Sequence, residues 1–307
     1  MIKFISAANR NPHLPLTEFH RQWTEDHGGL GVHLKWMLRY TQHMSLPETF
    51  GSELEPSYDG ASIHWVDNLE VLRAFPHPSK EPRDVALREV FLRHDAELFD
   101  RSLGWPRDHK RAWVTANERA VSEGEIRPDM VKLILLVSRR PGLTFEDFFD
   151  HWFNVHGPLC ARLPGLRRYL QNHGIREAYS FRPMTHDGWS ELWFDDLSAI
   201  RKAVSSPEWQ AAQEDGARLF AEPVARVVGR EITVKWGDYV TQDGGAREMS
   251  EDQIREKLQR QGYRRLAADP SAPRLIKAAA MDGALALWNE RHIVTLDMSR
   301  IDARPEL

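Results

Sequence analysis

Two histidines occupy matching places in two copies of one motif. His27 follows Trp23 by four residues. His156 follows Trp152 by the same interval. On a helix, this spacing puts each histidine one turn beyond its tryptophan on the same buried face. A histidine placed there can act as a general acid or base. The alternative is a structural histidine that bonds to the backbone. A copy in both halves favours this alternative, because an asymmetric substrate rarely needs two identical bases.

Two predicted strands, residues 39–44 and 167–173, carry a second set of polar side chains. One face of each strand presents a tyrosine and a glutamine, and on the other face His43 matches Asn172. A tyrosine and a histidine that face a cavity can hold an enolate and move its proton, which suits a lyase, a cyclase or an isomerase. The alternative is a hydrogen-bonded polar layer between sheet and helix.

The candidate site residues follow from these two patterns. We expect catalytic roles, or direct support for them, from His43, His173, Tyr40, Tyr169, His27 and His156. We expect substrate contacts from Gln42, Gln171, Asn172, Trp65 and Trp193. The tryptophans would stack on a flat aromatic substrate, and packing in the core of the sheet is the alternative. Where the halves differ, one half can have kept the chemistry while the other became scaffold.

Metal, thiol and nucleotide chemistry have little support in the sequence. Cys160 is the only cysteine, and it is either a nucleophile beside His156 or a small buried apolar residue. His20 and His27 share a helix face, but about 10 Å of helical rise separates them, too far for one ion. No glycine-rich nucleotide loop or nucleophile-elbow serine occurs. We predict no metal site and no resident cofactor, with haem as the alternative.

The candidate residues belong to two halves with the same order of elements. The motif copies are 129 positions apart (156 − 27), a period that fits a duplicated domain rather than a solenoid. Each half reads strand, helix, strand, strand, helix, strand. The first half gives 2–7, 17–27, 39–44, 61–66, a helical stretch to about 100, and 110–115. The second gives 131–137, a helix capped by Thr144 and ended by Gly157 and Pro158, then 167–173, 188–194, 198–219 and 224–236.

This order of elements is ferredoxin-like, with one antiparallel sheet and its helices on one face. The other sheet face needs cover, so the two α+β copies can close on each other as an intrachain pseudo-dimeric barrel around a central cavity. We place one domain at 1–120 and the other at 128–240, joined by a polar linker at 118–129. Phe75 to Arg88 is a proline-rich insertion. Residues 241–307 form a mainly helical extension, either a cap over the cavity or an oligomer contact.

The bulk composition is that of an ordinary globular protein. Hydrophobic residues make up 41% and charged residues 28% of the 307 positions. A net charge of −4 gives no reason to expect nucleic acid or an anionic membrane as a partner. No signal-peptide segment and no window long and apolar enough for a membrane span occur. We expect a cytoplasmic protein that binds a small hydrophobic substrate, with a homodimer as the candidate assembly.

The repeated motif also resembles a known family. The second half resembles the EthD family of the dimeric α+β barrel superfamily in Phe148, Trp152, His156-Gly157-Pro158-Leu159, Pro164-Gly165 and Tyr169-x-Gln171. The first half is similar through Phe19, Trp23, His27-Gly28-Gly29-Leu30 and Tyr40-x-Gln42, with Gly29 at the family's proline and Lys35-Trp36 in place of the Pro-Gly pair. Family members usually pair two chains to close one barrel, so the resemblance implies a pseudo-dimer within residues 1–240.

The resemblance implies several chemistries and does not choose among them. Relatives include lactone isomerases and polyketide-tailoring decarboxylases and dehydratases, and the superfamily also holds monooxygenases, cyclases and haem enzymes. We predict a cofactor-independent lyase or isomerase that uses acid–base catalysis on a small hydrophobic, oxygenated aromatic or polyketide-like catabolite. Two alternatives stay open: a monooxygenase or haem-dependent oxidoreductase, and a non-catalytic carrier of a hydrophobic metabolite.

Overall fold

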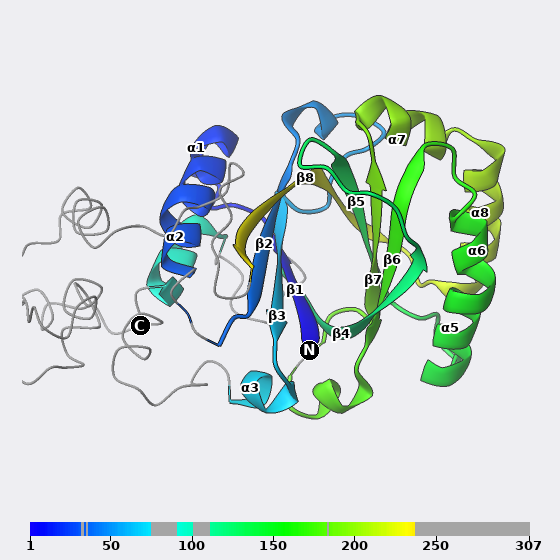
Figure 1. Cartoon of the computed structure of the whole chain (residues 1–307), viewed down its shortest axis with the longest axis horizontal. Helices are drawn as coiled ribbons and strands as arrows, with labels where there is room; N and C mark the ends of the chain where they lie inside the picture. The colour runs from blue at the N-terminus through cyan, green and yellow to red at the C-terminus, as the bar shows by residue number, and fades with distance from the viewer. Residues whose placement is uncertain (32–33, 35, 75–90, 101–110, 183, 237–307) are drawn as a thin grey trace, which may run out of the picture.

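A computed structural model describes residues 1–31, 34, 36–74, 91–100, 111–182 and 184–236 of the chain. The proline-rich insertion and the extension at 241–307 lie outside the described residues. Eight strands and the helices around them make up the described part (Figure 1).

The eight strands close into one antiparallel barrel in the order β1-β3-β2-β8-β5-β7-β6-β4. The first half supplies β1 (Ile2–Ala8), β2 (Arg39–Ser45), β3 (Gly60–Val66) and β4 (Arg111–Ser122). The second supplies β5 (Val131–Val137), β6 (Leu166–Gly174), β7 (Gly188–Phe194) and β8 (Ala225–Trp236). Two ferredoxin-like halves in one chain therefore form the predicted pseudo-dimeric barrel.

Each half closes the barrel by lending its last strand to the other half. β8 pairs with β2, and β4 pairs with β6. The prediction that β4 ends near Thr115 was wrong, and so was the start of the linker at residue 118, because the strand continues to Ser122. Residues 117–122 pair through their backbone with β6 of the second half. The sequence pattern of the first half alone does not indicate this partner strand.

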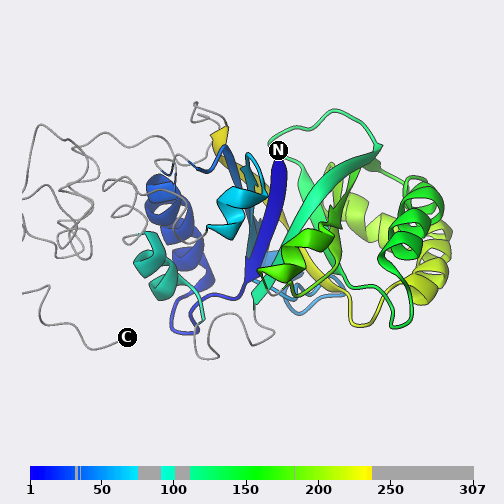
Figure 2. The same ribbon diagram turned by 90° about the horizontal axis from the view of Figure 1, so that it is seen from below.

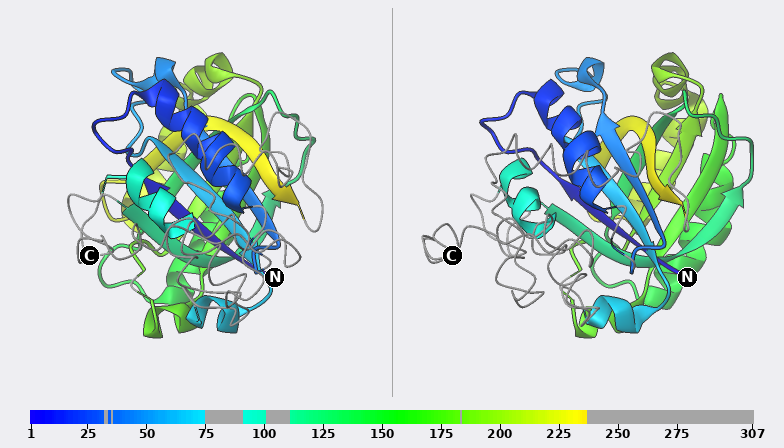
Figure 3. Two further views of the ribbon diagram at one scale, coloured as in Figure 1. Left: turned by 90° about the vertical axis from the view of Figure 1, so that its left-hand side faces the viewer. Right: turned by 60° about the vertical axis from the view of Figure 1, so that its left-hand side comes forward.

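The helices cover two opposite outer sides of the barrel, as Figures 1 and 2 show. The first half has α1 (Leu16–Arg21), the π-helix η1 (Gln22–His27), α2 (Gly28–Gly31), the 3₁₀ turn η2 (Pro47–Thr49), α3 (Leu69–Arg73) and helical residues 91–98. The second has α5 (Phe145–His151), the π-helix η3 (Trp152–His156), α6 (Gly157–Cys160), the 3₁₀ turn η4 (Arg176–Ser180), α7 (Leu197–Val204) and α8 (Pro207–Leu219). Figure 3 shows α1 lying across the outside of the first-half strands.

The ends of the α5–η3–α6 segment only partly match the prediction. Thr144 caps α5 as expected, because its side chain accepts a hydrogen bond from the Asp147 backbone N–H at 3.0 Å. Gly157 and Pro158 do not end the helix, which continues to Cys160. Pro158 lies in the first turn of α6, where a helix tolerates proline.

The repeated tryptophan and glycine of the motif are packing partners. A Cβ atom on Gly60 would lie 2.4 Å from the Trp23 ring, and one on Gly188 would lie 2.6 Å from the Trp152 ring. Both tryptophans are buried against the sheet through these glycines. The shared part of the motif therefore fixes each helix to its sheet.

Candidate functional site

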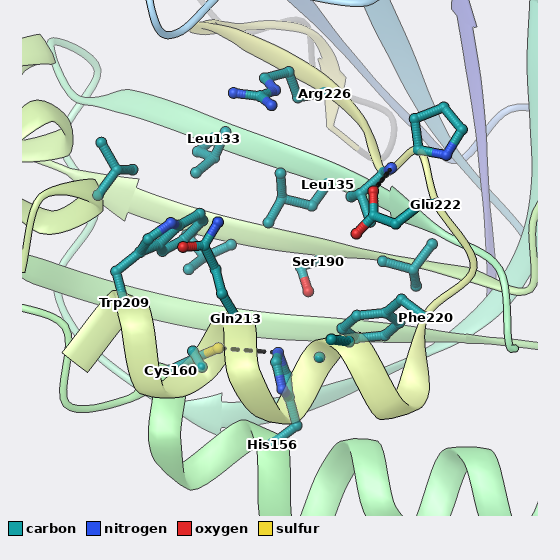
Figure 4. A pocket seen from close by; sticks show the side chains of 18 of the residues that line it. Leu133, Leu135, His156, Cys160, Ser190, Trp209, Gln213, Phe220, Glu222 and Arg226 are labelled. Carbon is teal, nitrogen blue, oxygen red and sulfur yellow. Dashed lines mark hydrogen bonds between the residues drawn. The ribbon is translucent and has the colours of Figure 1, made fainter. Parts of the chain in front are cut away.

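A pocket of about 250 Å³ lies in the second half, between α6 and α8 and the outer face of the sheet (Figure 4). Its apolar walls include Leu133, Leu135, Val137, Leu192, Trp209 and Phe220. Its polar lining consists of His156, Cys160, Tyr169, Ser190, Gln213, Glu222 and Arg226. This pocket is on the helix side of the sheet, whereas the sequence led us to expect a cavity inside the barrel.

His156 lies in this pocket at the end of η3, held by hydrogen bonds at both ring nitrogens. Its Nδ1 is 2.9 Å from Oδ2 of Asp215 on α8, and its Nε2 is 3.2 Å from Sγ of Cys160. A carboxylate only accepts, so we assign the ring proton to Nδ1 and the lone pair to Nε2. The other Asp215 oxygen is 2.8 Å from Nε2 of His151. His156 therefore presents a basic nitrogen that an aspartate orients.

Burial sets the protonation states of this group. It lowers the pKa of His156, and the opposing effect of Asp215 is smaller, so the imidazole is neutral near pH 7. Burial also raises the pKa of the Cys160 thiol to about 12. The thiol stays protonated and donates to His156 Nε2, which gives no support to Cys160 as a ready thiolate nucleophile.

Two hydroxyl groups share the pocket with His156. The Tyr169 hydroxyl is 3.3 Å from Ser190 Oγ and accepts a hydrogen bond from Gln171 Nε2 at 2.9 Å. Burial raises the pKa of Tyr169 far above its ordinary value, so it keeps its proton. Because Gln171 occupies an acceptor position of this oxygen, the phenol proton is left to donate.

The matching region of the first half is filled by stacked rings. His64 stacks on Phe4 and on Tyr40, both at 4.5 Å between ring centroids. Phe4 also stacks on Trp113 at 4.7 Å. All four rings lie on the helix side of β1–β4 and are buried.

The second half carries different side chains at three of these four positions. Tyr169 matches Tyr40, whereas Leu133 and Leu192 form the cross-strand pair that matches Phe4 and His64. Arg226 takes the place of Trp113. Arg226 pairs with Leu135 of β5, and Trp113 pairs with Ser6, the equivalent residue of β1. The pocket exists where two rings of the stack become leucines and a third becomes arginine.

His27 matches His156 in sequence but has other surroundings. Its ring lies 3.9 Å from the Phe91 ring and 5.5 Å from the His94 ring. Gly31 stands where the second half has the cysteine, 129 positions earlier, and a Cβ there would lie 2.9 Å from the Tyr40 ring. At the position that matches Asp215, the first half has His94. Each stands five residues before a phenylalanine that forms an isolated bridge, Phe220 for Asp215 and Phe99 for His94. The first half therefore lacks the thiol, and the Asp95 carboxylate beside His27 lies 3.9 Å from Nε2, beyond hydrogen-bond distance.

Comparison with known proteins identifies the repeated unit. Residues 140–223, which include α5 to α8, β6 and β7, match the family described as the EthD domain. The second half of the chain therefore contains an EthD domain. The first half supplies the other four strands of the same barrel.

Individual proteins that the chain resembles are distant from it in sequence. The decarboxylase claH of Passalora fulva is 24% identical over 144 residues, which cover 43% of this chain and 91% of that protein. An anthrone oxidase-like protein of known structure is 12% identical, with a TM-score of 0.51 over 76% of this chain and 92% of its own, and this likeness shows the fold alone. An EthD-family protein from Bacillus halodurans is 26% identical over 33% of this chain and 97% of its own, with a TM-score of 0.27.

The two glutamines at equivalent positions of the halves bond to the helices. Gln42 Nε2 donates to the Trp23 carbonyl at 2.9 Å and to the Tyr40 hydroxyl at 2.7 Å. Gln171 Nε2 donates to the Trp152 carbonyl at 2.8 Å. Both carbonyls belong to π-helical residues. These glutamines therefore form the polar layer between sheet and helix that was the alternative interpretation.

His173 lies in the same layer, outside the pocket lining. Its Nε2 is 2.8 Å from Gln171 Oε1, and its ring stacks on Phe149 and Trp152 at 4.7 and 4.9 Å. Burial and then the nearby Arg119 lower its pKa to about 3, so it is neutral at any physiological pH.

His43, by contrast, faces the inside of the barrel. Its Nε2 is 2.9 Å from Glu231 Oε2, and Glu231 also bonds to Lys132. Lys132 Nζ reaches Glu191 Oε2 at 2.6 Å, and Asn172 Nδ2 donates to Glu191 Oε1 at 3.0 Å. The structure thus brings His43 and Asn172 together in one network of hydrogen bonds and ion pairs inside the barrel, apart from His156.

The predicted tryptophans also belong to this interior cluster. The Lys132 ammonium lies 4.0 Å from the Trp193 ring centroid, and that of Lys3 lies 5.0 Å from the Trp65 centroid. A third tryptophan, Trp189, donates its indole N–H to Glu191 Oε1 at 3.1 Å. Neither Trp65 nor Trp193 lines the pocket.

The pseudo-twofold axis of the barrel relates two lysines of the interior to each other. Lys3 and Lys132 are 129 positions apart, and each bonds to a carboxylate at the same place, Glu118 for the first and Glu231 for the second. Glu191 bonds to both lysines and has no such counterpart, because the matching position is Ile63. Although burial opposes it, the pull of the two ammonium groups holds the pKa of Glu191 far below its ordinary value.

Sequence reasoning missed Asp215, Ser190 and Arg226 of the pocket, and the interior lysines. A signal for the lysines was present, since a lysine interrupts an otherwise apolar first strand at the same place in both halves. Asp215 and Arg226 come from different elements from His156, with no local motif to join them. Among the described residues no group of three or more potential ligands is placed to hold a metal ion. In the same part of the chain, every helix is too short or too polar to cross a membrane.

Proposed function

We propose that this EthD protein is an acid–base enzyme that binds a small, mostly apolar, oxygenated substrate in the second-half pocket. The observation that carries the proposal is the His156–Asp215 pair, which presents a basic nitrogen to a pocket of about 250 Å³. General base catalysis needs a neutral imidazole with an oriented lone pair, and the lowered pKa of His156 supplies the neutral form.

Proton transfer at a carbon atom is the chemistry that these groups suit. His156 Nε2 exchanges its weak hydrogen bond from the Cys160 thiol for the substrate proton, and Asp215 stabilises the imidazolium that forms. The Tyr169 hydroxyl, assisted by Ser190, donates to the oxygen on which negative charge develops. The enolate formed in this way is common to elimination, isomerisation and cyclisation, and none of these steps requires a bound cofactor.

Decarboxylation is the member of this group that a relative supports, because claH of Passalora fulva is named a decarboxylase. In that reaction the bond to the carboxyl carbon breaks and carbon dioxide leaves. His156 takes the proton of the substrate's carboxyl group before this bond breaks, and it then returns the proton to the electron pair left on the substrate carbon. A lyase is therefore the preferred class, and an isomerase is the second.

The pocket also separates the proposed base from the other predicted histidines. His173 bonds to Gln171 and His43 to Glu231, and neither lines the pocket. We therefore assign the base to His156, with His43 and His173 kept as variants to be tested beside it.

The test measures exchange of the acidic α-protons of β-tetralone, a small aryl ketone, in deuterium oxide by proton NMR. We expect His156→Gln to slow exchange about 100-fold and Asp215→Asn about 10-fold. The matched control is His27→Gln, which alters the equivalent histidine of the first half and should leave exchange unchanged. His43→Gln and His173→Gln should do the same.

Exchange that persists in His156→Gln and stops in His43→Gln would move the base to the barrel interior. Tight binding of the ketone without exchange by the wild-type protein would identify a carrier instead. A Soret band in the purified protein would replace the proposal with haem chemistry.

A further inference from the structure

The two halves carry different side chains at equivalent places on the helix side of the sheet. In the first half, Trp113, Phe4 and His64 lie face to face, with interplanar angles of 20° and 17°. In the second half, Leu133 and Leu192 replace two of these flat rings and line the pocket. The strands that border the pocket in the second half are therefore equivalent to the strands that carry the stacked aromatic rings in the first half.

Arg226 replaces the third ring and brings a charge to the pocket. Its guanidinium donates to the Glu53 backbone carbonyl at 3.2 Å. No carboxylate of the described residues lies within 4.0 Å of it as an ion-pair partner. A half-buried arginine that borders apolar walls without a carboxylate has donors left for an anionic ligand.

The two polar parts of the pocket are well separated. Figure 4 shows Arg226 and His156 on opposite sides of the pocket, with Leu133 and Leu135 between them. Glu222 borders the same pocket, and its Oε2 accepts a hydrogen bond from the Val224 backbone N–H at 3.1 Å. A ligand that reaches both parts must be apolar in the middle.

We propose that the pocket selects a flat aromatic ring system bearing one anionic group, and that Arg226 recognises the anion. The ring takes the place that Phe4 and His64 fill in the first half, and the anionic oxygen lies against the guanidinium. The proton-transfer centre of the ligand then faces His156 at the other end. This inference rests on the proposed function only in placing the ligand in this pocket.

The first-half ring stack, with an arginine from the second half, is a partial precedent for this arrangement. There the Arg182 guanidinium lies 4.5 Å from the ring centroid of Trp113, at the end of the ring stack. Guanidinium planes stack on aromatic faces and also bind carboxylates in a bidentate manner. In the second half the arginine is part of the strand itself, so the ring can come from a ligand.

The experiment compares two flat ligands of the same shape, β-naphthoate and the neutral β-naphthamide, by isothermal titration calorimetry on the full chain. We expect the wild-type protein to bind the acid roughly 10-fold or more tightly than the amide, because a charge-assisted hydrogen bond distinguishes them. Arg226→Gln should bring the two affinities together, and Arg226→Lys should retain part of the preference. Arg230→Gln, which alters an exposed arginine of the same strand, is the matched control and should retain all of it.

Equal affinities in the wild-type protein, or an equal loss for both ligands in Arg226→Gln, would overturn the inference. A saturated decalin carboxylate that binds as tightly as β-naphthoate would contradict the requirement for a flat ring. The proposed function fails separately, because His156→Gln tests proton exchange and should not change the preference for the acid over the amide.

Discussion

The outer faces of the two halves differ in one respect that decides where a ligand fits. Both halves share the buried tryptophan, the glutamine that bonds to the π-helix, and the glycine beneath the indole. On the first-half face, four buried rings stack on the helix side of the sheet. On the second-half face, three of those rings are absent and the pocket with His156 takes their place. The comparison teaches that the repeated motif builds the scaffold, whereas the residues around it decide between core and site.

The barrel interior offers a second contrast, between Glu191 and Ile63. Glu191→Leu removes the carboxylate that both buried lysines share, so the first and largest expected effect is a loss of about 3–5 kcal/mol in the free energy of unfolding. Urea denaturation followed by tryptophan fluorescence measures it. Glu118→Leu is the control, because Glu118 is 38% exposed and bonds to one lysine, and it should cost much less. Equal losses of unfolding free energy in both variants would show that bonding to two lysines gives Glu191 no larger stabilising effect than bonding to one.

Filling the pocket should turn the second half into a copy of the first. Leu133→Phe combined with Leu192→His restores the two rings that the first half carries at these positions. We expect β-naphthoate binding to weaken at least roughly 10-fold, because the rings occupy the space of the ligand. Calorimetric titration measures the affinity, and an unchanged unfolding midpoint shows that the fold is retained. Undiminished binding would place the ligand site elsewhere.

The smallest expected effect concerns pH and the carboxylate at the seam of the halves. Lys132 and His43 lower the pKa of Glu231 from 4.5 to about 2 although burial opposes them. The stability that Glu231 contributes is complete above pH 4.5, its unfolded value, and is lost as the pH falls through about 2. Glu231→Gln should flatten the dependence of the unfolding midpoint on pH in this window. A variant as acid-sensitive as the wild-type protein would contradict the assignment.

The sequence was sufficient for the barrel because the repeat occurs in one register. Matching motifs 129 positions apart predicted two equivalent sheets, and the apolar face of each required the other. The length of β4 was missed because residues 117–122 are stabilised by a strand from the other half, and their own pattern is polar. Pro158 gave a wrong helix end because its position in the first turn of α6 depends on the π-helical turn before it.

The candidate site was only partly predictable. His156 and Tyr169 were named as candidates from the motif. Whether they can act on a ligand depends on Asp215 and on whether aromatic rings or leucines surround them. Aligning the halves shows Phe4 against Leu133, and such an exchange of one apolar residue for another looks neutral in sequence. Only the spatial neighbours show that one member completes a ring stack while the other borders a pocket.

Covalent linkage of the halves has a consequence for the interior charges. In a barrel made from two identical chains, every substitution appears twice. A glutamate at the position of Glu191 would then stand on both sides of the axis, and two lysines would face four carboxylates. Because both halves belong to one polypeptide, an odd number of charges can occupy the centre. Because the two copies are joined in one chain, a substitution in one half is not repeated in the other, and each half can change alone.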